Sequence, residues 1–313
     1  MIYAGIDLGG TTIKGALVNE EGKILRAKSV PTRGERPHRE VVKDMADLIV
    51  ELAKEEGLAP EEIKTVGIGS PGSIDPIGGR IIFAGNFADF RNVPMVAIMQ
   101  ETLPNTRIFL ENDANVAALG ESLFGAGRGS RNVVMITIGT GLGGGIIIDG
   151  KIFSGAFYGG AEMGHQVIVA DGVPCTCGRK GCWEAYSSAT ALIRMAHEEA
   201  ALHTDSLIHK RGDELNAKDV FDFAESGDAA AQEALQKYYR YLIIGLANTI
   251  NVFQPEYLII GGGPSAQGDK LLNPVVEGVK SEVFASNLVT KVVIAELGND
   301  AGVIGAAMLG RNA

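Results

Sequence analysis

The sequence contains no uninterrupted apolar run of about 18 residues, the length that a membrane-spanning helix needs, so we expect no membrane partner. It shows no basic segment ahead of an apolar one near its start, where Asp7 follows almost at once, and we expect no secretory signal. Basic residues are the minority: 28 Lys and Arg stand against 38 Asp and Glu, and this formal net charge of −10 argues against nucleic-acid binding. Cysteine is scarce. The three cysteines lie between Cys175 and Cys182, which excludes a disulfide framework and favours a reducing cytoplasm.

Glycine, in contrast, is in excess. It supplies 42 of 313 residues, about 13%, against roughly 7% in an average protein. Many of these glycines are grouped, which indicates places where the backbone comes close to another group. The rest of the composition, 46% hydrophobic and 21% charged, is that of an ordinary globular protein, and the length predicts about two domains.

The two halves of the chain share one order of elements. The first half predicts strands at 2–7, 13–19 and 24–30, a helix at 40–56, a strand at 65–69, a helix at 93–103 and a strand at 107–110. The second half predicts strands at 132–138, 146–149 and 151–154, helices at 187–202, 217–226 and 228–253, a strand at 257–260, a helix at 269–285, a strand at 291–295 and a small-residue helix at 301–310. This duplication predicts an α/β fold with a sheet in each lobe and a cleft between the lobes.

The first glycine group lies on a turn between two predicted strands. It carries a carboxylate, two glycines, two hydroxyls and an ammonium group: Asp7, Gly9, Gly10, Thr11, Thr12 and Lys14. Backbone N–H groups of such a turn can form a nest for phosphate, and Asp7 at the strand end can orient Mg²⁺ through water. The alternative interpretation is a simple hairpin with a capping Asp.

Two further glycine groups follow strands in the second half. The first of these, the turn at 139–145, includes Gly139, Thr140, Gly141 and Gly143 and could bind phosphate in the same way. It contains the pattern G-x-G-x-x-G at Gly139, Gly141 and Gly144, but a strand follows it where the dinucleotide fingerprint requires a helix. The group Gly261, Gly262 and Gly263 does precede a helix; Pro264 and the lack of an acidic partner weaken it, and a nicotinamide enzyme stays as an alternative. There is no Walker A motif.

One histidine and the three cysteines lie within 18 positions of one another. His165, Cys175, Cys177 and Cys182 fit a tetrahedral Cys₃His zinc site. All four positions would be filled by protein, so the zinc would be structural. The alternatives are three free thiols or a redox pair, although Cys-x-Cys lacks the usual C-x-x-C spacing.

These motifs together resemble known families. The three glycine groups are similar to the phosphate-1, phosphate-2 and adenosine motifs of the superfamily that contains sugar kinases and actin. The segment from Glu162 to Glu184 reads E-x-G-H followed by C-x-C-G-x-x-G-C-x-E and resembles the signature of the ROK family (repressors, open reading frames, kinases). Within that family the chain looks most like bacterial ATP-dependent glucokinases.

The resemblance implies a two-lobed actin-like (ribonuclease H-like) ATPase fold with a duplicated mixed-sheet core. It implies a small lobe of residues 1–112 plus 300–313, to which the last helix returns, and a large lobe of residues 113–299. It also implies a homodimer.

The resemblance further assigns roles at the sugar site. Asp113 would be the catalytic base, whereas its sequence position alone would also suit a helix N-cap. The other residues implied to bind sugar are Gly72, Asn86, Asn112, Glu162, His165 and Glu184. A Trp common four residues after the asparagine is Phe90 here, and Phe can still pack at that position.

The implied activity is transfer of a phosphoryl group from Mg-ATP to the 6-hydroxyl of glucose, in a cleft that closes on the sugar. Kinases for N-acetylmannosamine, N-acetylglucosamine, fructose, allose or mannose share these motifs and stay open, as do ADP or polyphosphate as donors. A sugar-responsive repressor would carry a helix-turn-helix domain ahead of Asp7, which we do not expect. A non-catalytic sensor would be expected to lack Asp113.

Overall fold

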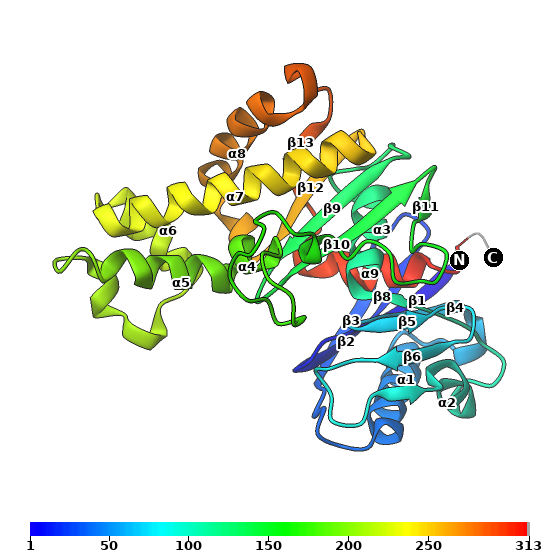
Figure 1. The fold of residues 1–313 in the computed structure, drawn as a ribbon. Coiled ribbons are helices and arrows are strands. Elements are labelled where there is room, and N and C mark those ends of the chain that lie inside the picture. The colour runs from blue at the N-terminus through cyan, green and yellow to red at the C-terminus, as the bar shows by residue number, and fades with distance from the viewer. Residues whose placement is uncertain (312–313) are drawn as a thin grey trace. The chain divides into compact units, whose positions relative to one another are not determined.

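The computed structural model describes residues 1–311 and shows an α/β fold (Figure 1). The first five-stranded sheet has the order β3-β2-β1-β4-β8. Its strands are β1 (Ile2–Leu8), β2 (Thr12–Asn19), β3 (Ile24–Pro31), β4 (Ile63–Ser70) and β8 (Arg107–Asn112). The second sheet has the order β11-β10-β9-β12-β13. Its strands are β9 (Val133–Ile138), β10 (Leu142–Ile148), β11 (Lys151–Ile152), β12 (Tyr257–Gly262) and β13 (Lys291–Ile294). When the five strands of each sheet are counted in chain order, both sheets have the spatial order third, second, first, fourth and fifth. This shared order confirms the predicted duplication.

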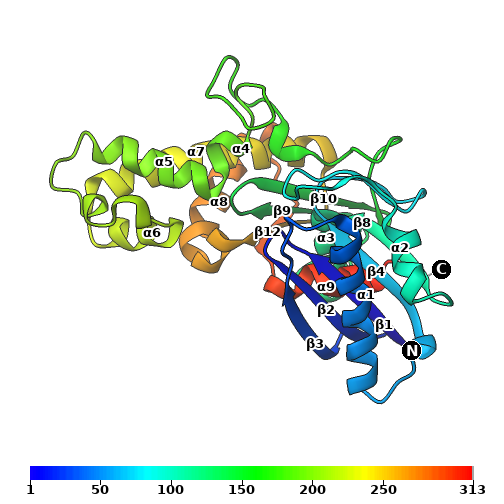
Figure 2. The ribbon, with the colours of Figure 1, turned by 90° about the horizontal axis from the view of Figure 1, so that it is seen from below.

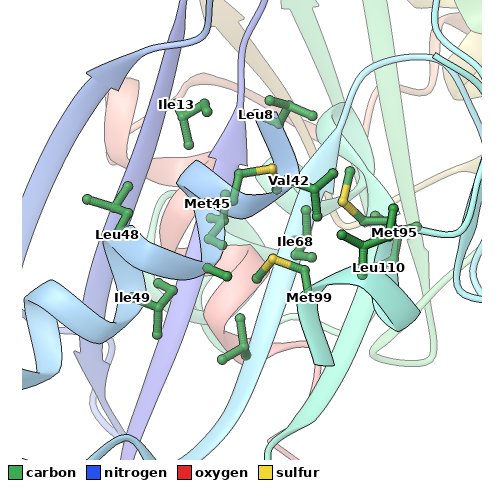
Figure 3. Close-up of a cluster of buried hydrophobic side chains, with 14 of the residues drawn as sticks. Leu8, Ile13, Val42, Met45, Leu48, Ile49, Ile68, Met95, Met99 and Leu110 are labelled. Atoms are coloured by element: carbon green, nitrogen blue, oxygen red, sulfur yellow. The ribbon is translucent and has the colours of Figure 1, made fainter. Parts of the chain in front are cut away.

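The two faces of the first sheet carry different side chains. On β1 the alternate residues Ala4, Ile6 and Leu8 are buried in one apolar cluster with helix α1 (His38–Glu55) and helix α2 (Met95–Thr102). The apolar stripe of α1 includes Val42, Met45, Leu48 and Ile49, the helical spacing that the sequence predicts (Figure 3). Figure 3 also shows Met95 and Met99 of α2 reaching the same cluster.

The opposite face packs unusually close to the last helix, α9 (Ala301–Met308). A Cβ placed on Gly5 would lie 2.0 Å from the carbonyl oxygen of Val303, and one on Gly67 would lie 1.8 Å from that of Ala306. Helix α3 (Asp113–Phe124) crosses α9 equally closely, since a Cβ on Gly305 would lie 1.7 Å from the Val116 oxygen. The small-residue final helix therefore packs directly on the first sheet and on α3.

A third sheet was not predicted from the sequence. It has three short strands, β5 (Ser73–Asp75), β6 (Arg80–Phe83) and β7 (Arg91–Val93). The turn between β5 and β6 is closed by the Gly78 N–H, which donates to Asp75 Oδ1 at 2.8 Å, and Gly79 adopts a positive φ of 62°. The paired glycines between two short apolar runs were the available signal. The sheet is important because Gly72 precedes β5 and Asn86 lies between β6 and β7.

Of the other α-helices in the described residues, four lie along the chain between β11 and β12 and one lies between β12 and β13. They are α4 (Glu184–Ser187), α5 (Ala189–Ala200), α6 (Ala217–Glu225), α7 (Ala229–Phe253) and α8 (Asp269–Glu282). Helices α5 and α7 run alongside each other (Figures 1 and 2). No helix within residues 1–311 is both long and apolar enough to cross a membrane.

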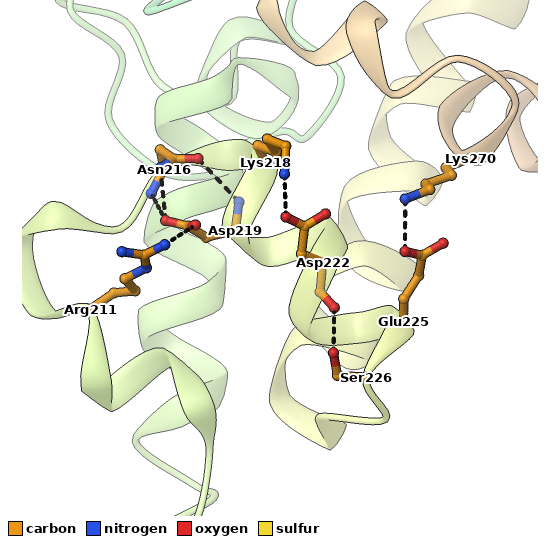
Figure 4. Close-up of polar contacts among 8 residues, drawn as sticks. All are labelled: Arg211, Asn216, Lys218, Asp219, Asp222, Glu225, Ser226 and Lys270. Carbon is orange, nitrogen blue, oxygen red and sulfur yellow. Dashed lines mark hydrogen bonds and ion pairs between the residues drawn. The ribbon is translucent and has the colours of Figure 1, made fainter.

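Polar contacts fix the ends of α6 (Figure 4). Asn216 and Asp219 form a capping box at its start, and Arg211 pairs with Asp219 at 2.8 Å. Lys270 of α8 pairs with Glu225 near the end of α6 at 2.7 Å. These contacts tie α6 to its neighbours.

The chain divides into two compact units. The first contains residues 1–133, 145–161 and 296–313, and the second contains residues 134–144 and 162–295. These divisions differ from the boundaries expected after residues 112 and 299, and residues 312 and 313 of the expected small lobe lie outside the described residues. The lobe boundaries and the cleft stay predictions.

Candidate active site

The first glycine turn joins β1 to β2, as predicted. Asp7 and Lys14 face each other across the strand pair, and the Gly9 N–H donates to the Thr12 carbonyl at 3.0 Å. A Cβ on Gly9 would lie 2.8 Å from that carbonyl oxygen, so the tight turn excludes a side chain there. Gly10, Thr11 and Thr12 are exposed, which leaves them available to a ligand.

Thr32, which follows β3, fixes the shape of this turn. Its hydroxyl donates to the Gly9 carbonyl at 2.7 Å and its N–H donates to the Thr11 carbonyl at 2.9 Å. Thr32 is fully buried. Sequence reasoning missed this residue because it lies 23 positions from Gly9 and belongs to no motif.

Parallel strands bring the first-unit carboxylates to one edge of the sheet. Asp7 of β1 pairs in register with Gly69 of β4, and Gly69 pairs with Glu111 of β8, directly ahead of Asn112 and Asp113. Since the carboxyl ends of parallel strands lie at the same edge, the first glycine turn and Asp113 become neighbours.

The charge of Asp113 acts on Asp7 across this edge of the sheet. Burial and the charge of Asp113 raise the pKa of Asp7 to about 6, although Lys14 acts in the opposite direction. The first turn of α9 also approaches this carboxylate, because a Cβ on Gly302 would lie 2.7 Å from Asp7 Oδ2. Lys14 itself forms an ion pair with Asp300 and donates to the Asn299 carbonyl at 3.0 Å, so its ammonium group is already engaged.

Asn112, and not Asp113, is the N-cap of α3. Its Oδ1 accepts the N–H groups of Ala114 at 2.9 Å and Asn115 at 3.3 Å. The alternative in which Asp113 serves only as the cap is therefore wrong. Burial raises the pKa of Asp113, while hydrogen bonds from the Ala114 N–H and from Asn112 oppose that rise. Asp113 is a partly buried carboxyl group whose pKa is displaced toward the range useful in a general base.

The small third sheet brings Gly72 and Asn86 to the same region of the first unit. The Asn112 Nδ2 group donates to the Gly72 carbonyl at 3.4 Å. Gly72 has a φ of 96°, and a Cβ there would lie 2.2 Å from the Phe83 carbonyl oxygen, so only glycine fits. A Cβ on Gly10 would lie 3.9 Å from the Cβ of Asn86, which places the predicted sugar loop beside the phosphate turn.

Phe90, the departure from the family pattern, is buried at this loop. Its ring stacks on that of Phe87 with centroids 4.3 Å apart. The aromatic packing expected at this position is thus present with Phe.

The second glycine turn joins β9 to β10, so a strand follows it as predicted. The Ala189 N–H donates to the Gly139 carbonyl and the Thr190 hydroxyl donates to the Thr140 carbonyl, both at 2.9 Å. Gly262, with a φ of 88°, packs against the end of β9: a Cβ on Gly262 would lie 2.0 Å from the Ile138 carbonyl oxygen. The second and third glycine groups therefore lie side by side within the second unit.

The third glycine group does not open an α-helix. A 3₁₀-helix, Gly263–Gln267, follows it, and α8 begins only at Asp269. The dinucleotide fingerprint requires a helix directly after its glycines, so this geometry counts against the nicotinamide alternative.

The four predicted zinc ligands converge. The ligand atoms of His165, Cys175, Cys177 and Cys182 all lie within 4.8 Å of one another. The His165 Nδ1 atom lies 3.6 Å from Cys175 Sγ, and Cys177 Sγ lies 3.7 Å from Cys182 Sγ. A tetrahedral zinc with Zn–S bonds of about 2.3 Å separates its ligand atoms by about 3.5 to 3.8 Å, which these distances match. The Sγ–Sγ distance between Cys177 and Cys182 is far too long for a disulfide bond, and all three cysteines are free thiols.

The other predicted sugar residues of the second unit surround the second glycine turn. Glu162 is exposed and precedes the 3₁₀-helix Met163–His165. A Cβ on Gly164 would lie 2.1 Å from the Leu142 carbonyl oxygen, and Glu184 Oε2 accepts the Leu142 N–H at 2.9 Å. Glu184 Oε1 accepts the hydroxyl of Thr176 at 3.2 Å, a contact that no motif predicts. His165 turns Nδ1 toward the thiols, which leaves Nε2 for another partner.

Comparison with known proteins gives concordant matches over the whole chain. The family model described as the ROK family matches residues 3–313. A glucokinase from Thermotoga maritima is 40% identical over 309 residues, which cover 97% of this chain and 96% of that protein. The solved structure of a ROK family glucokinase from Streptomyces griseus, in complex with glucose and AMPPNP, is 35% identical, with a TM-score of 0.83 and 100% of both chains covered. A xylose repressor from Bacillus subtilis is 32% identical over 90% of this chain and 69% of the repressor.

Proposed function

This chain belongs to the ROK family, and we propose from that premise that it is a glucokinase, which transfers the γ-phosphoryl group of ATP to the 6-hydroxyl of glucose. The products are ADP and glucose 6-phosphate. Glucose 6-phosphate is the form in which glucose enters glycolysis. Glucokinases are its relatives at 37–40% identity over nearly the full chain. The observation that carries the proposal is the neighbourhood of Asp7 and Asp113, because it brings a general base to the phosphate turn within one unit.

Asp113 accepts the proton of the glucose 6-hydroxyl as that oxygen attacks the γ-phosphorus. The new bond joins O6 to phosphorus, and the bond between phosphorus and the bridging oxygen breaks, so ADP leaves with the electron pair. The raised pKa of Asp113 makes its carboxylate a stronger base than an exposed aspartate. Asn112 donates to a sugar hydroxyl through Nδ2, because its Oδ1 caps α3.

The glycine turns bind the nucleotide. In the first unit, phosphate is contacted by Gly9, Gly10, Thr11 and Thr12. Lys14 is a further predicted contact, and its ion pair with Asp300 must break before its ammonium group can reach the phosphate. Gly139, Thr140, Gly141 and Gly143 contact phosphate in the second unit, and Gly261–Gly263 contact the adenosine. Asp7 is a partly buried carboxylate, the oxygen donor that Mg²⁺ prefers, and bound Mg²⁺ would neutralise charge on the β- and γ-phosphates.

The remaining sugar hydroxyls are bound by Gly72, Asn86, Glu162, Glu184 and the Nε2 atom of His165. Zinc on His165, Cys175, Cys177 and Cys182 would supply rigidity to the segment that carries both glutamates. With zinc on the Nδ1 side, the His165 ring presents Nε2–H as a donor to the sugar.

The setting of the enzyme belongs to the same proposal. The three cysteines form no disulfide, and cysteines that serve as metal ligands suit a reducing cytoplasm. We infer a homodimer from the family resemblance, and no nucleic acid or membrane as partner.

A sugar panel tests the proposal. Zinc-loaded protein is assayed for ADP release from Mg-ATP with glucose, mannose, fructose, allose, N-acetylglucosamine and N-acetylmannosamine, and the product is identified by NMR. We expect the highest kcat/KM with glucose and phosphate on O6. A higher kcat/KM with another hexose would make that hexose the assigned substrate and would leave the proposed mechanism unchanged. Binding of a sugar without turnover by any donor would indicate a sensor instead.

A further inference from the structure

Both carboxylate oxygens of Glu184 are already hydrogen-bonded, each by a different part of the second unit. Oε2 accepts the N–H of Leu142, in the second glycine turn, at 2.9 Å. Oε1 accepts the hydroxyl of Thr176, in the zinc loop, at 3.2 Å. Glu184 thus joins the loop that would hold zinc to the turn that would hold phosphate.

The main chain of Glu184 is fixed independently of these bonds. The neighbouring Trp183 is fully buried, and its N–H donates to the Gln166 carbonyl at 2.8 Å. Its indole fills the space over Gly245 of α7, where a Cβ would lie 1.9 Å from the ring. Cys182, two residues before Glu184, is one of the converging metal ligands. With the backbone held in this way, side-chain rotation is the main freedom left to Glu184.

The two hydrogen bonds restrict that rotation. An ionised carboxylate offers about four lone-pair sites. Oε2 uses one for the Leu142 N–H, and Oε1 accepts the Thr176 hydroxyl and also, at 3.8 Å, the Cys175 thiol, which loses its proton when the sulfur binds zinc. Glu184 therefore keeps free sites for sugar hydroxyls. Oε2 also lies close to Gly141, because a Cβ on this glycine would lie 2.4 Å from the oxygen. On the side of Oε1, Thr176 supplies the hydroxyl that holds the carboxylate.

We propose that Thr176 is a positioning residue for sugar recognition: its hydroxyl orients the Glu184 carboxylate before the sugar arrives. The inference rests on the proposed function, since it needs Glu184 to accept hydrogen bonds from the sugar. An ordered carboxylate binds sugar more tightly because less side-chain entropy is lost on binding. Thr176 does not touch the transferred phosphoryl group, so the chemical step is left unchanged.

Two variants separate the hydroxyl from the shape of the side chain. Thr176→Val removes the hydroxyl and keeps the branched shape, whereas Thr176→Ser keeps the hydroxyl. We expect Thr176→Val to raise the Kd and the KM for glucose about three- to tenfold, with kcat and the KM for ATP within about twofold of wild type. Thr176→Ser should stay within about twofold in every parameter.

Zinc analysis and a matched control keep this test specific. Thr204→Val makes the same change at an exposed threonine outside the site and should leave all parameters unchanged. Zinc content should equal that of wild type in all three variants. The proposal is overturned if Thr176→Val binds glucose like wild type, if Thr176→Ser is impaired as strongly as Thr176→Val, or if Thr176→Val loses its zinc.

The outcomes also distinguish this proposal from the one on which it rests. If wild type phosphorylates glucose and Thr176→Val has an unchanged glucose Kd, only the role of Thr176 fails. If wild type neither binds nor phosphorylates any sugar of the panel, the proposed function fails and the role of Thr176 fails with it.

Discussion

At the residue scale, the free protein holds Asp7 in an environment that disfavours its charge. Burial and the negative charge of Asp113 both act against ionisation. A carboxylate held in this way is a poor contributor to the stability of the unliganded protein. It gains favourable partners when cations and donors of a ligand enter the site.

The first prediction concerns the pH dependence of stability. The folded-state pKa of Asp7, about 6, lies above the ordinary aspartate pKa of 3.8, so between these pH values the folded protein binds more protons than the unfolded one. Stability contributed by Asp7 is present at acidic pH and is lost as pH rises through about 6. The free energy of unfolding of Asp7→Asn should therefore be about 1 to 3 kcal/mol higher than that of wild type at pH 7.5, and this difference should shrink toward pH 4.

Urea unfolding of both proteins without ligands, at pH values from 4 to 7.5, measures this difference. The same variant should lose most of its kinase activity, because its amide cannot replace the carboxylate beside the phosphate turn. A difference in stability that is independent of pH would contradict the electrostatic account of Asp7.

The second prediction concerns the metal ligands. Cys177→Ser replaces a thiolate donor by a hydroxyl, so the remaining three groups should hold zinc much more weakly. We expect about one zinc per chain in wild type after dialysis against a mild chelator, and well under half of that in the variant. The glucose KM should rise, because the segment between Glu162 and Glu184 loses its cross-link. Full zinc occupancy in Cys177→Ser, measured by elemental analysis, would remove Cys177 from the site.

At the scale of elements, the close crossings of α9 depend on missing side chains. In Gly305→Ala the new Cβ would lie 1.7 Å from a carbonyl oxygen of α3, a backbone atom that cannot rotate away. We expect a loss of about 2 to 4 kcal/mol in the free energy of unfolding. Gly278→Ala is the matched control: it makes the same change in helix α8, but the nearest atom is the terminal methyl of Ile243 at 2.2 Å.

Chemical unfolding of the two variants compares these sites. The control should lose clearly less stability, since a flexible side chain can move and alanine favours a helix by up to about 1 kcal/mol. Equal losses in both variants would show that the crossing of α3 and α9 has no special sensitivity.

Elements with strong periodicity could be predicted from the sequence, and elements held by distant partners could not. The apolar stripe of α1, which repeats several times, and the continuous apolar run of β1 identify these two elements. The strands Ser73–Asp75 and Arg91–Val93 have three residues each, too few for alternation to be recognised. Their pairing depends on β6 between them, which local sequence does not encode.

The candidate site divides in the same way. The zinc ligands could be predicted because all four lie in one short segment with a known ligand set, and their convergence is confirmed. Thr32 and Thr176 could not, because each acts through a partner that only the fold brings near. The roles assigned to the nucleotide- and sugar-binding residues stay predictions.

At the scale of the whole molecule, one strand order is used twice. The structural likeness to a ROK family glucokinase extends over the full length of both chains, and the actin-like α/β fold with a duplicated sheet is confirmed. In each sheet a glycine turn follows the first strand, so the duplication places one such turn in each half of the chain.

The fourth prediction concerns the assembly. We expect a homodimer of twice 32.9 kDa, which is 65.8 kDa, by analytical ultracentrifugation at micromolar concentration. The mass should stay at that value on removal of glucose and nucleotide. A sedimenting species of 32.9 kDa at every concentration would refute the dimer and leave the proposed reaction untouched.

The most direct test of the central claim is the kinetics of Asp113→Asn with glucose and Mg-ATP. The variant keeps the shape of the side chain and the cap formed by Asn112, so the fold and the glucose Kd should be nearly unchanged. Because the general base is lost, kcat should fall by about 10² to 10⁴-fold. A kcat within a few-fold of wild type, with glucose binding intact, would contradict the assignment of Asp113 and the mechanism built on it.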